Sequence, residues 1–215
     1  MACVLLASPL NAALAGAPAL RLDGLAGVQE IVVSVSDLGM ASRTWRTVAG
    51  YEIKWQGTER RGLADLWQID PTSRLHSRLL GLRGHDGGLL RLTAIGGRGA
   101  PRAPQIRSSA RPFDVGGIFN FNVLVRDIDA TFEALRQHGF QGFADPNRYV
   151  LFGKRYAGAL LRGPDGVVVN LLQRVDEPYD DQPRFTRVSH VTNATQMVAS
   201  FERSFDFFTR QLGWC

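Results

Sequence analysis

The sequence contains only two cysteines among its 215 residues, Cys3 and Cys215, and they stand at opposite ends of the chain. This spacing argues against a disulfide framework and against a cysteine metal site. The net charge is +5, yet the arginines are scattered and form no basic run, so a nucleic-acid partner is not expected. No apolar run is long enough to span a bilayer. The chain therefore reads as a globular protein with room for a sizeable core.

The first residues fit two descriptions. Residues 1–19 are rich in alanine and leucine, and both Ala13-Leu14-Ala15 and Ala17-Pro18-Ala19 match a small-residue cleavage site. The positive segment that opens a secretory signal is missing. Residues 1–26 are therefore interpreted as a signal-like or loosely ordered arm. We prefer the signal, which would place the protein in the periplasm or outside the cell rather than in the cytoplasm.

One pattern organises the rest of the chain. After Gly117, an alternating apolar run predicts a strand, and Asp127 or Asp129 supplies the oxygen that caps a following helix. Gly139 ends that helix, and a second extended segment follows to Phe143. The unit is strand, helix, strand, and it recurs. Three occurrences of one pattern indicate an internal repeat.

Two copies extend into complete βαβββ modules, at residues 27–97 and 117–175. In the first, strands are predicted at 31–35, 52–56, 75–82 and 89–95, with a further stretch of strand character at 63–69, and a helix is predicted at 39–48. In the second, the later strands are predicted at 149–152, 156–162 and 167–172. A turn at 163–166 separates the last two of these strands. Residues 98–116 and 176–185 have the composition of linkers.

The third copy, residues 186–215, is incomplete. Val198-Ala199-Ser200 stands where the first copy has Val35-Ser36-Asp37, and Gly213 stands where the first copy has Gly50. The strands that would complete this module are absent, which leaves an apolar helix face and strand edges to be covered. We therefore expect the sequence to be a fragment of a longer, four-module protein or a shortened gene product.

The paired repeat resembles the vicinal oxygen chelate superfamily, which includes glyoxalase I, extradiol dioxygenases and bleomycin-resistance proteins. The resemblance is carried by VVSVSDLGMASRTWRTVAGYE, NVLVRDIDATFEALRQHGFQ and RGPDGVVVNLLQR. It implies an α+β fold in which tandem βαβββ modules curl their mixed sheets into a cup, plus the partial third module. In that family a divalent metal sits in the cup, held by residues of the first and closing strands.

At the positions implied by the resemblance, this sequence has Glu30 and Arg91 in the first module, and Asn120 and Asn170 in the second. The third copy has Asn193 there, with His190 expected on the opposite strand face. Arginine has no acceptor and cannot ligate a metal. We expect Arg91 to pair with Glu30 instead, so that the cup holds neither metal nor cofactor. Asn122 points inward if Asn120 does.

The ligand-binding residues are therefore predicted to be Glu30, Arg91, Asn120, Asn122, Asn170 and Tyr156. Trp67 and Phe152 are further candidates for the lining, whereas His76, His85 and His138 are expected at the surface. No catalytic residue stands out, and whether the protein is an enzyme stays open. A structural role for Glu30 is favoured over one as a general base, because Arg91 beside it would stabilise the charged carboxylate.

Three functions are compatible with this reading. The first is a metal-free cup that binds a small organic ligand, either as a lyase- or isomerase-like enzyme or as a binder of the bleomycin-resistance kind. The second is a metal-dependent glyoxalase- or dioxygenase-type enzyme whose active modules lie outside this chain. The third is a structural module pair. A homo-oligomer is compatible with all three.

Overall fold

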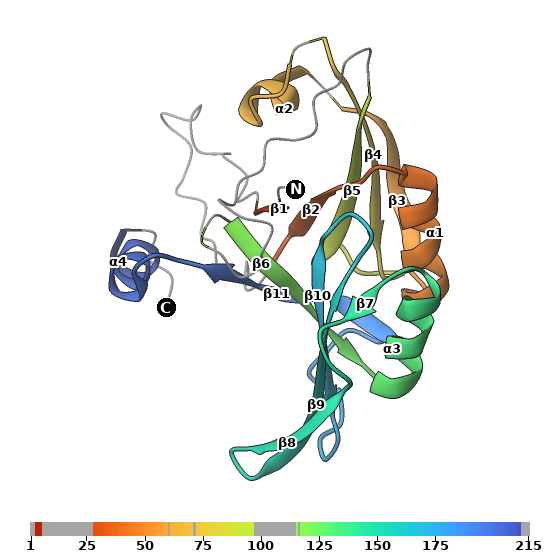
Figure 1. Ribbon diagram of the computed structural model, residues 1–215, viewed down its shortest axis with the longest axis vertical. Helices are drawn as coiled ribbons and strands as arrows, with labels where there is room; N and C mark the ends of the chain where they lie inside the picture. Colours follow the sequence, from red (N-terminus) through yellow and green to blue (C-terminus); the bar gives the residue numbers. More distant parts are fainter. Residues whose placement is uncertain are drawn as a thin grey trace.

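A computed structural model describes residues 3–5, 28–59, 61–70, 72–96, 115 and 117–211. Most of the predicted linker at 98–116 and the predicted stop at Gly213 lie outside these residues. Two mixed sheets and a small number of helices confirm the expected α+β class (Figure 1). None of the described helices has the length and apolar character needed to cross a membrane.

The first module has the predicted element order with one addition. Its elements are β2 (Glu30–Ser34), α1 (Leu38–Ala49), β3 (Glu52–Thr58), α2 (Arg61–Leu66), β4 (Arg74–Gly81) and β5 (Leu89–Gly96). The prediction of strand character at 63–69 was wrong, because α2 and a turn occupy this stretch. Leu63 and Leu66 are three residues apart, which is a helical spacing. A short strand that was not predicted, β1 (Cys3–Leu5), pairs antiparallel with β2.

The second module repeats the first with a divided second strand. Its elements are β6 (Gly117–Val125), α3 (Ile128–Gln137), β7 (Gln141–Gly142), β8 (Asn147–Leu151), β9 (Lys154–Arg162) and β10 (Val168–Arg174). In both modules the first and closing strands are parallel neighbours, β2 with β5 and β6 with β10, and the remaining strands add antiparallel. The shared topology supports the repeat that the sequence predicted.

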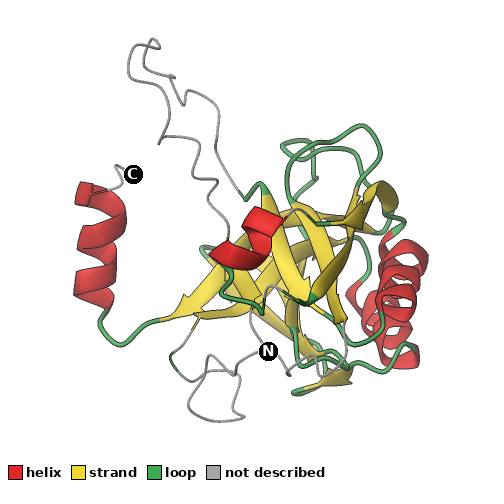
Figure 2. Cartoon of the chain, turned by 90° about the horizontal axis from the view of Figure 1, so that it is seen from above, coloured by secondary structure: helices red, strands yellow, loops and turns green. Residues whose placement is uncertain are grey.

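The third copy contributes β11 (Val188–Met197), α4 (Phe201–Asp206) and a π-helical turn, η1 (Phe207–Gln211). β11 joins the second sheet by pairing antiparallel with β6. In contrast, α4 and η1 bury no residue, and Phe201 and Phe205 are 70% and 54% exposed. Figure 2 shows α4 apart from the sheets, whereas α1 and α3 pack together. The expected uncovered helix face is thus present in the described chain.

The helices of the three repeat copies, α1, α3 and α4, begin in the same way. The Asp37 carboxylate accepts a hydrogen bond from the Met40 amide at 2.8 Å, and Asp127 does the same for Ala130 at 2.9 Å. Ser200 caps α4 through its hydroxyl oxygen, which accepts from the Arg203 amide at 3.3 Å. The aligned Val-x-Asp positions therefore mark helix N-caps. Of the two predicted caps for α3, Asp127 is the one used.

One core joins the first two modules. Trp45 of α1 packs against Phe121 of β6 and Phe140 after α3, with ring centroids 5.5 and 6.1 Å apart. All three side chains are buried. Because Phe121 faces this core, strand alternation turns its neighbours Asn120 and Asn122 to the other face of β6. The core thereby sets the direction in which the second module's polar side chains point.

Candidate functional site

The first module gathers a charged cluster on β2 and β5. Arg91 donates to both oxygens of Glu30, from Nε and Nη2, each at 2.9 Å. Its Nη1 donates to Glu59 at 2.7 Å, and its guanidinium lies 5.6 Å from the ring centroid of Trp55. The expected pairing of Arg91 with Glu30 is present. Glu59, which follows β3, was not predicted, because only the curl of the sheet brings it to this point.

The charged groups of this cluster bond one another and are largely shielded from solvent. The side chains of Arg91, Glu30 and Glu59 are only 16%, 18% and 10% exposed. Burial alone lowers the pKa of Arg91, but hydrogen bonds and charge from Glu30 and Glu59 outweigh burial and raise it. A guanidinium held by two carboxylates is charge-satisfied. The arrangement is suited to holding β2, β3 and β5 together.

In the second module, asparagine side chains gather on the face of the sheet that points away from the Trp45–Phe121 core. Asn122 Oδ1 accepts from Asn120 Nδ2 at 2.9 Å and from Asn170 Nδ2 at 2.8 Å. Asn122 Nδ2 in turn donates to Oδ1 of Asn193 on β11. The three predicted asparagines therefore meet, with Asn193 as a fourth member. We call these four residues the asparagine cluster.

The asparagine cluster leaves one buried acceptor open. Asn120 is 4% exposed, and its Oδ1 has no hydrogen-bond partner among the described residues. Unpaired buried polar atoms are rare in folded proteins and call for an explanation such as a bound water or ligand. Among the described residues, no hydrogen bond or ion pair joins the asparagine cluster to Glu30 and Arg91. The four expected positions Glu30, Arg91, Asn120 and Asn170 thus take part in two separate hydrogen-bond networks.

An open cleft of about 1260 Å³ adjoins the asparagine cluster and includes Asn193 in its lining. Leu124 and Leu172 form part of its surface, two residues along β6 and β10 from Asn122 and Asn170. Its other walls come from the 85–88 turn, the β8–β9 hairpin, segment 177–183 and β11. The cleft therefore lies where the second module meets the 85–88 turn, segment 177–183 and β11.

Aromatic side chains form one wall of the cleft. Tyr149 and Tyr156 are stacked, with ring centroids 5.9 Å apart, and Phe152 at the hairpin turn also lines the cleft. Burial, and then the neighbouring Tyr156, raise the pKa of Tyr149. The predicted Tyr156 and the further candidate Phe152 thus lie at this cleft, whereas Trp67 does not line it. As ligand contacts, these residues stay predictions.

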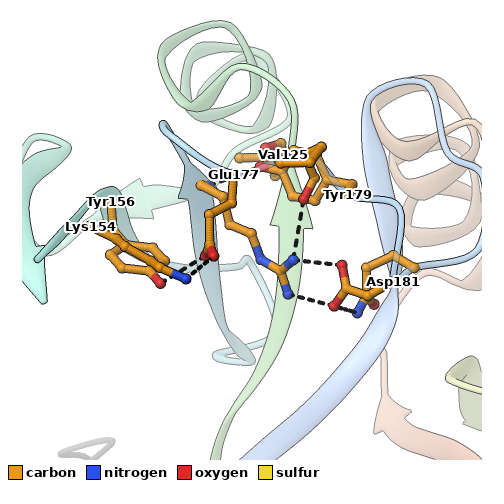
Figure 3. A network of polar contacts seen from close by, with 9 residues as sticks. Val125, Lys154, Tyr156, Glu177, Tyr179 and Asp181 are labelled. Carbon is orange, nitrogen blue, oxygen red and sulfur yellow. Dashed lines mark hydrogen bonds and ion pairs between the residues drawn. The ribbon is translucent and has the colours of Figure 1, made fainter. Parts of the chain in front are cut away.

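The wall next to the aromatic side chains is held by ion pairs. Arg174 donates from Nη1 and Nη2 to the two oxygens of Asp181 at 2.6 and 3.0 Å. Figure 3 shows Glu177 reaching Lys154 and Tyr156, with Asp181 on the other side of the network. The hydrogen bond from Lys154 is the main cause that lowers the pKa of Glu177. These contacts tie segment 177–183 to β9 and β10.

Two histidines at the edge of the cleft were missed. His85 and His190 both line it, with ring centroids 4.6 Å apart. His190 was expected on the face opposite Asn193, but both side chains reach the cleft. Pairing of β11 with β6 shifts register between Val188 and Val191 and again between Val191 and Asn193. Irregular pairing of this kind breaks strand alternation, and a sequence pattern does not reveal it.

Comparisons with known proteins agree on the fold. A Bacillus cereus glyoxalase family protein superposes with TM-score 0.55 at 16% identity, over 75% of this chain and 99% of its own. Maize glyoxalase I superposes with TM-score 0.54 at 18% identity, over 86% of this chain and 54% of its own. A putative dioxygenase from Bacillus subtilis gives TM-score 0.52 at 14% identity, with coverages of 86% and 54%.

The chain has the vicinal oxygen chelate fold. The resemblance seen in the sequence is confirmed at this level, and the chain spans about half the length of the maize and B. subtilis proteins. No protein-family model matches the sequence, and a search of curated proteins finds no match. Identities this low support the fold and leave function to the residues of the site.

The vicinal oxygen chelate fold implies a metal site, and the donor set here does not fit one. Arg91 occupies the closing-strand position of the first module and engages Glu30 in a bidentate pair. Asn120 and Asn170 both direct their NH₂ groups at Asn122. Among the described residues, no group of three or more His, Cys, Asp or Glu side chains converges as metal ligands would.

Proposed function

We propose that this protein binds a small, partly apolar organic ligand in the cleft of its second module without using a metal. The observation that carries the proposal is that an aromatic wall and Asn193 of the asparagine cluster line one open cleft. Binding sites characteristically combine apolar lining with a few converging polar groups. Both non-catalytic binding and a lyase- or isomerase-like reaction are compatible with this arrangement.

The polar end of the ligand would meet Asn193. Asn193 Oδ1 already accepts from Asn122, whereas no partner of Asn193 Nδ2 is present among the described residues. That NH₂ group is a donor for a ligand oxygen. The flat part of the ligand would lie against Tyr149 and Tyr156, where aromatic contact adds roughly 0.5–1.5 kcal/mol beyond area burial.

The proposal is tested with 2-naphthol as a probe and naphthalene as the matched probe that lacks an oxygen. Saturation-transfer NMR should detect 2-naphthol with a Kd of roughly 0.1–1 mM, as expected for a small ligand. Tyr156→Ala should weaken both probes. Asn193→Ala should weaken 2-naphthol alone. Phe143→Ala is the control, because Phe143 is 46% exposed and does not line the cleft. Equal binding to all four proteins would contradict the proposal.

A metal-dependent enzyme of the glyoxalase or extradiol dioxygenase type is the second candidate, favoured by the similarity to maize glyoxalase I and to the putative dioxygenase from Bacillus subtilis. Dialysis against Zn²⁺, Ni²⁺, Mn²⁺ or Fe²⁺ followed by metal analysis separates the two. We expect less than stoichiometric metal after desalting, in wild type and in Glu30→Gln alike. Stoichiometric metal that Glu30→Gln abolishes would replace our proposal with the metal-dependent one.

A further inference from the structure

The β8–β9 hairpin presents an open strand edge. Among the described residues β8 pairs with β9 alone, and each of its five residues is exposed. Val150 and Leu151 are 66% and 47% exposed, and Phe152 at the turn is 92% exposed. Proteins usually protect such edges with charged side chains, proline or a bulge. β8 contains no lysine, proline or bulge, and its one charged side chain, Arg148, pairs with Asp129.

The turn of the hairpin keeps β8 paired with β9. Phe152 and Gly153 have φ values of +50° and +75°, the signature of a two-residue turn that matches the twist of paired strands. Positive φ is unfavourable for phenylalanine, and asparagine is the more usual residue at such a position. An exposed aromatic residue kept in a strained position points to a role outside the monomer.

The free backbone groups of β8 belong to Arg148 and Val150. On β9, the Arg155 N–H donates to the Asp176 carboxylate, and the Arg155 carbonyl accepts from the Val175 amide. Both backbone groups of Arg155 therefore point away from β8. Lys154 and Tyr156 therefore direct their backbone groups to β8, where they face Leu151 and Tyr149. By alternation, the N–H and C=O groups of Arg148 and Val150 point away from β9.

We propose that two copies of this chain pair through antiparallel β8 strands, about a two-fold axis at Tyr149. This register places Arg148 opposite Val150 of the second copy, so that both exchange backbone hydrogen bonds, and Asn147 opposite Leu151. No two like charges face each other. Arg148 is already neutralised on its own chain by Asp129, at 2.5 Å. The edge is thus complementary to itself in both hydrogen bonding and charge.

The pairing also changes the cleft. Residues directly opposite in an antiparallel pair lie on the same face of the sheet. Tyr149 and Leu151 line the cleft, so Tyr149 of the second copy would extend the same aromatic wall. The two clefts would then open on one side of a continuous sheet, with four tyrosines, Tyr149 and Tyr156 from each copy, between them. Dimer formation itself does not rest on the proposed ligand binding.

Sedimentation velocity of the full chain tests the pairing. We expect a shift from monomer to dimer between about 1 and 100 µM, since a single strand pair is a small interface. Val150→Pro removes an outward N–H without breaking the ladder to β9, and it should be monomeric throughout with an unchanged circular dichroism spectrum. Val150→Lys serves if the proline variant does not fold. A monomeric wild type, or variants that dimerise as wild type does, would overturn the proposal.

Cross-linking tests the register. In a background with Cys3→Ser and Cys215→Ser, Tyr149→Cys should form a disulfide-linked dimer on mild oxidation, because residues on the axis of a non-hydrogen-bonded pair lie close enough. Val150→Cys is the matched control, since its neighbour across the axis is Arg148. Equal cross-linking of the two variants on a non-reducing gel would show random collision and reject this register.

Discussion

The imidazole rings of His85 and His190 are 4.6 Å apart, and they connect the first module to the first strand of the third. Beside them, the Val191 amide donates to the Gly88 carbonyl at 2.9 Å. Gly88 has φ +60°, and a Cβ there would lie 2.4 Å from the Val191 carbonyl oxygen. The junction is therefore tight, and His190 Nδ1 is buried within it without a partner among the described residues.

The first prediction is that acid weakens this junction. Burial, and then the charge of His85, lower the pKa of His190 below its ordinary 6.5. His190 consequently binds a proton more readily in the unfolded chain than in the folded chain. The contribution of neutral His190 to the free energy of unfolding is therefore complete above pH 6.5 and is lost as the pH falls. Asp86, next to His85 in the chain, also lines the cleft.

The measurement is urea unfolding at pH 7.5 and pH 5.5. Wild type should lose more stability between these values than His190→Gln does. His76→Gln is the control, because His76 is exposed and its side chain shares a hydrogen bond with Thr58 at the surface. The carboxylates with lowered pKa values, such as Asp176 and Glu177, titrate at lower pH and leave this window clear. Equal losses in wild type and His190→Gln would contradict the prediction.

The second prediction concerns Arg91. Replacing Arg91 by alanine leaves the carboxylates of Glu30 and Glu59 unpaired at low exposure, which should cost roughly 3 kcal/mol in the free energy of unfolding. Arg83→Ala is the matched control, since Arg83 is 92% exposed and pairs with Glu52 at the surface. Its cost should stay below about 1 kcal/mol. Similar losses for the two variants in urea unfolding would show that the buried cluster does not stabilise the fold.

The third prediction concerns the shared core. Trp45→Ala should destabilise the protein by about 3–5 kcal/mol, because a large side chain is lost between Tyr51, Phe121 and Phe140. Unfolding followed by far-ultraviolet circular dichroism should stay a single transition in wild type, since the first two modules share this core. Two separate transitions in wild type would contradict a common core.

The fourth prediction compares the helix caps. Asp127→Ala should lower global stability by about 1 kcal/mol, because α3 packs on the sheet and loses a capping bond. Ser200→Ala should reduce helical signal while leaving the global unfolding midpoint unchanged, since α4 buries no residue. A Ser200→Ala effect as large as that of Asp127→Ala would mean that α4 is coupled to the core.

Much of the fold could be predicted because its signals are local. The Val-x-Asp positions report N-caps, and Gly50 with φ +73° ends α1 where the sequence places a stop. The strand character assigned to 63–69 failed because a short apolar run fits a helix as well as a strand. The position of His190 failed because alternation does not hold across the irregular pairing of β11.

The site was predictable only within one module. The resemblance to the vicinal oxygen chelate superfamily identified Glu30, Arg91, Asn120 and Asn170, and Asn122 followed because residues two apart on a strand share a face. The sequence by itself determined the repeat, the helix caps and the presence of a single carboxylate, Glu30, among the four expected ligand positions, because each depends on residue type and short spacing. The tertiary structure alone decided that Glu59 completes the arginine cluster, that Asn193 joins the asparagines, and that His85 meets His190. These contacts depend on how curled sheets bring distant segments together, which no local pattern encodes.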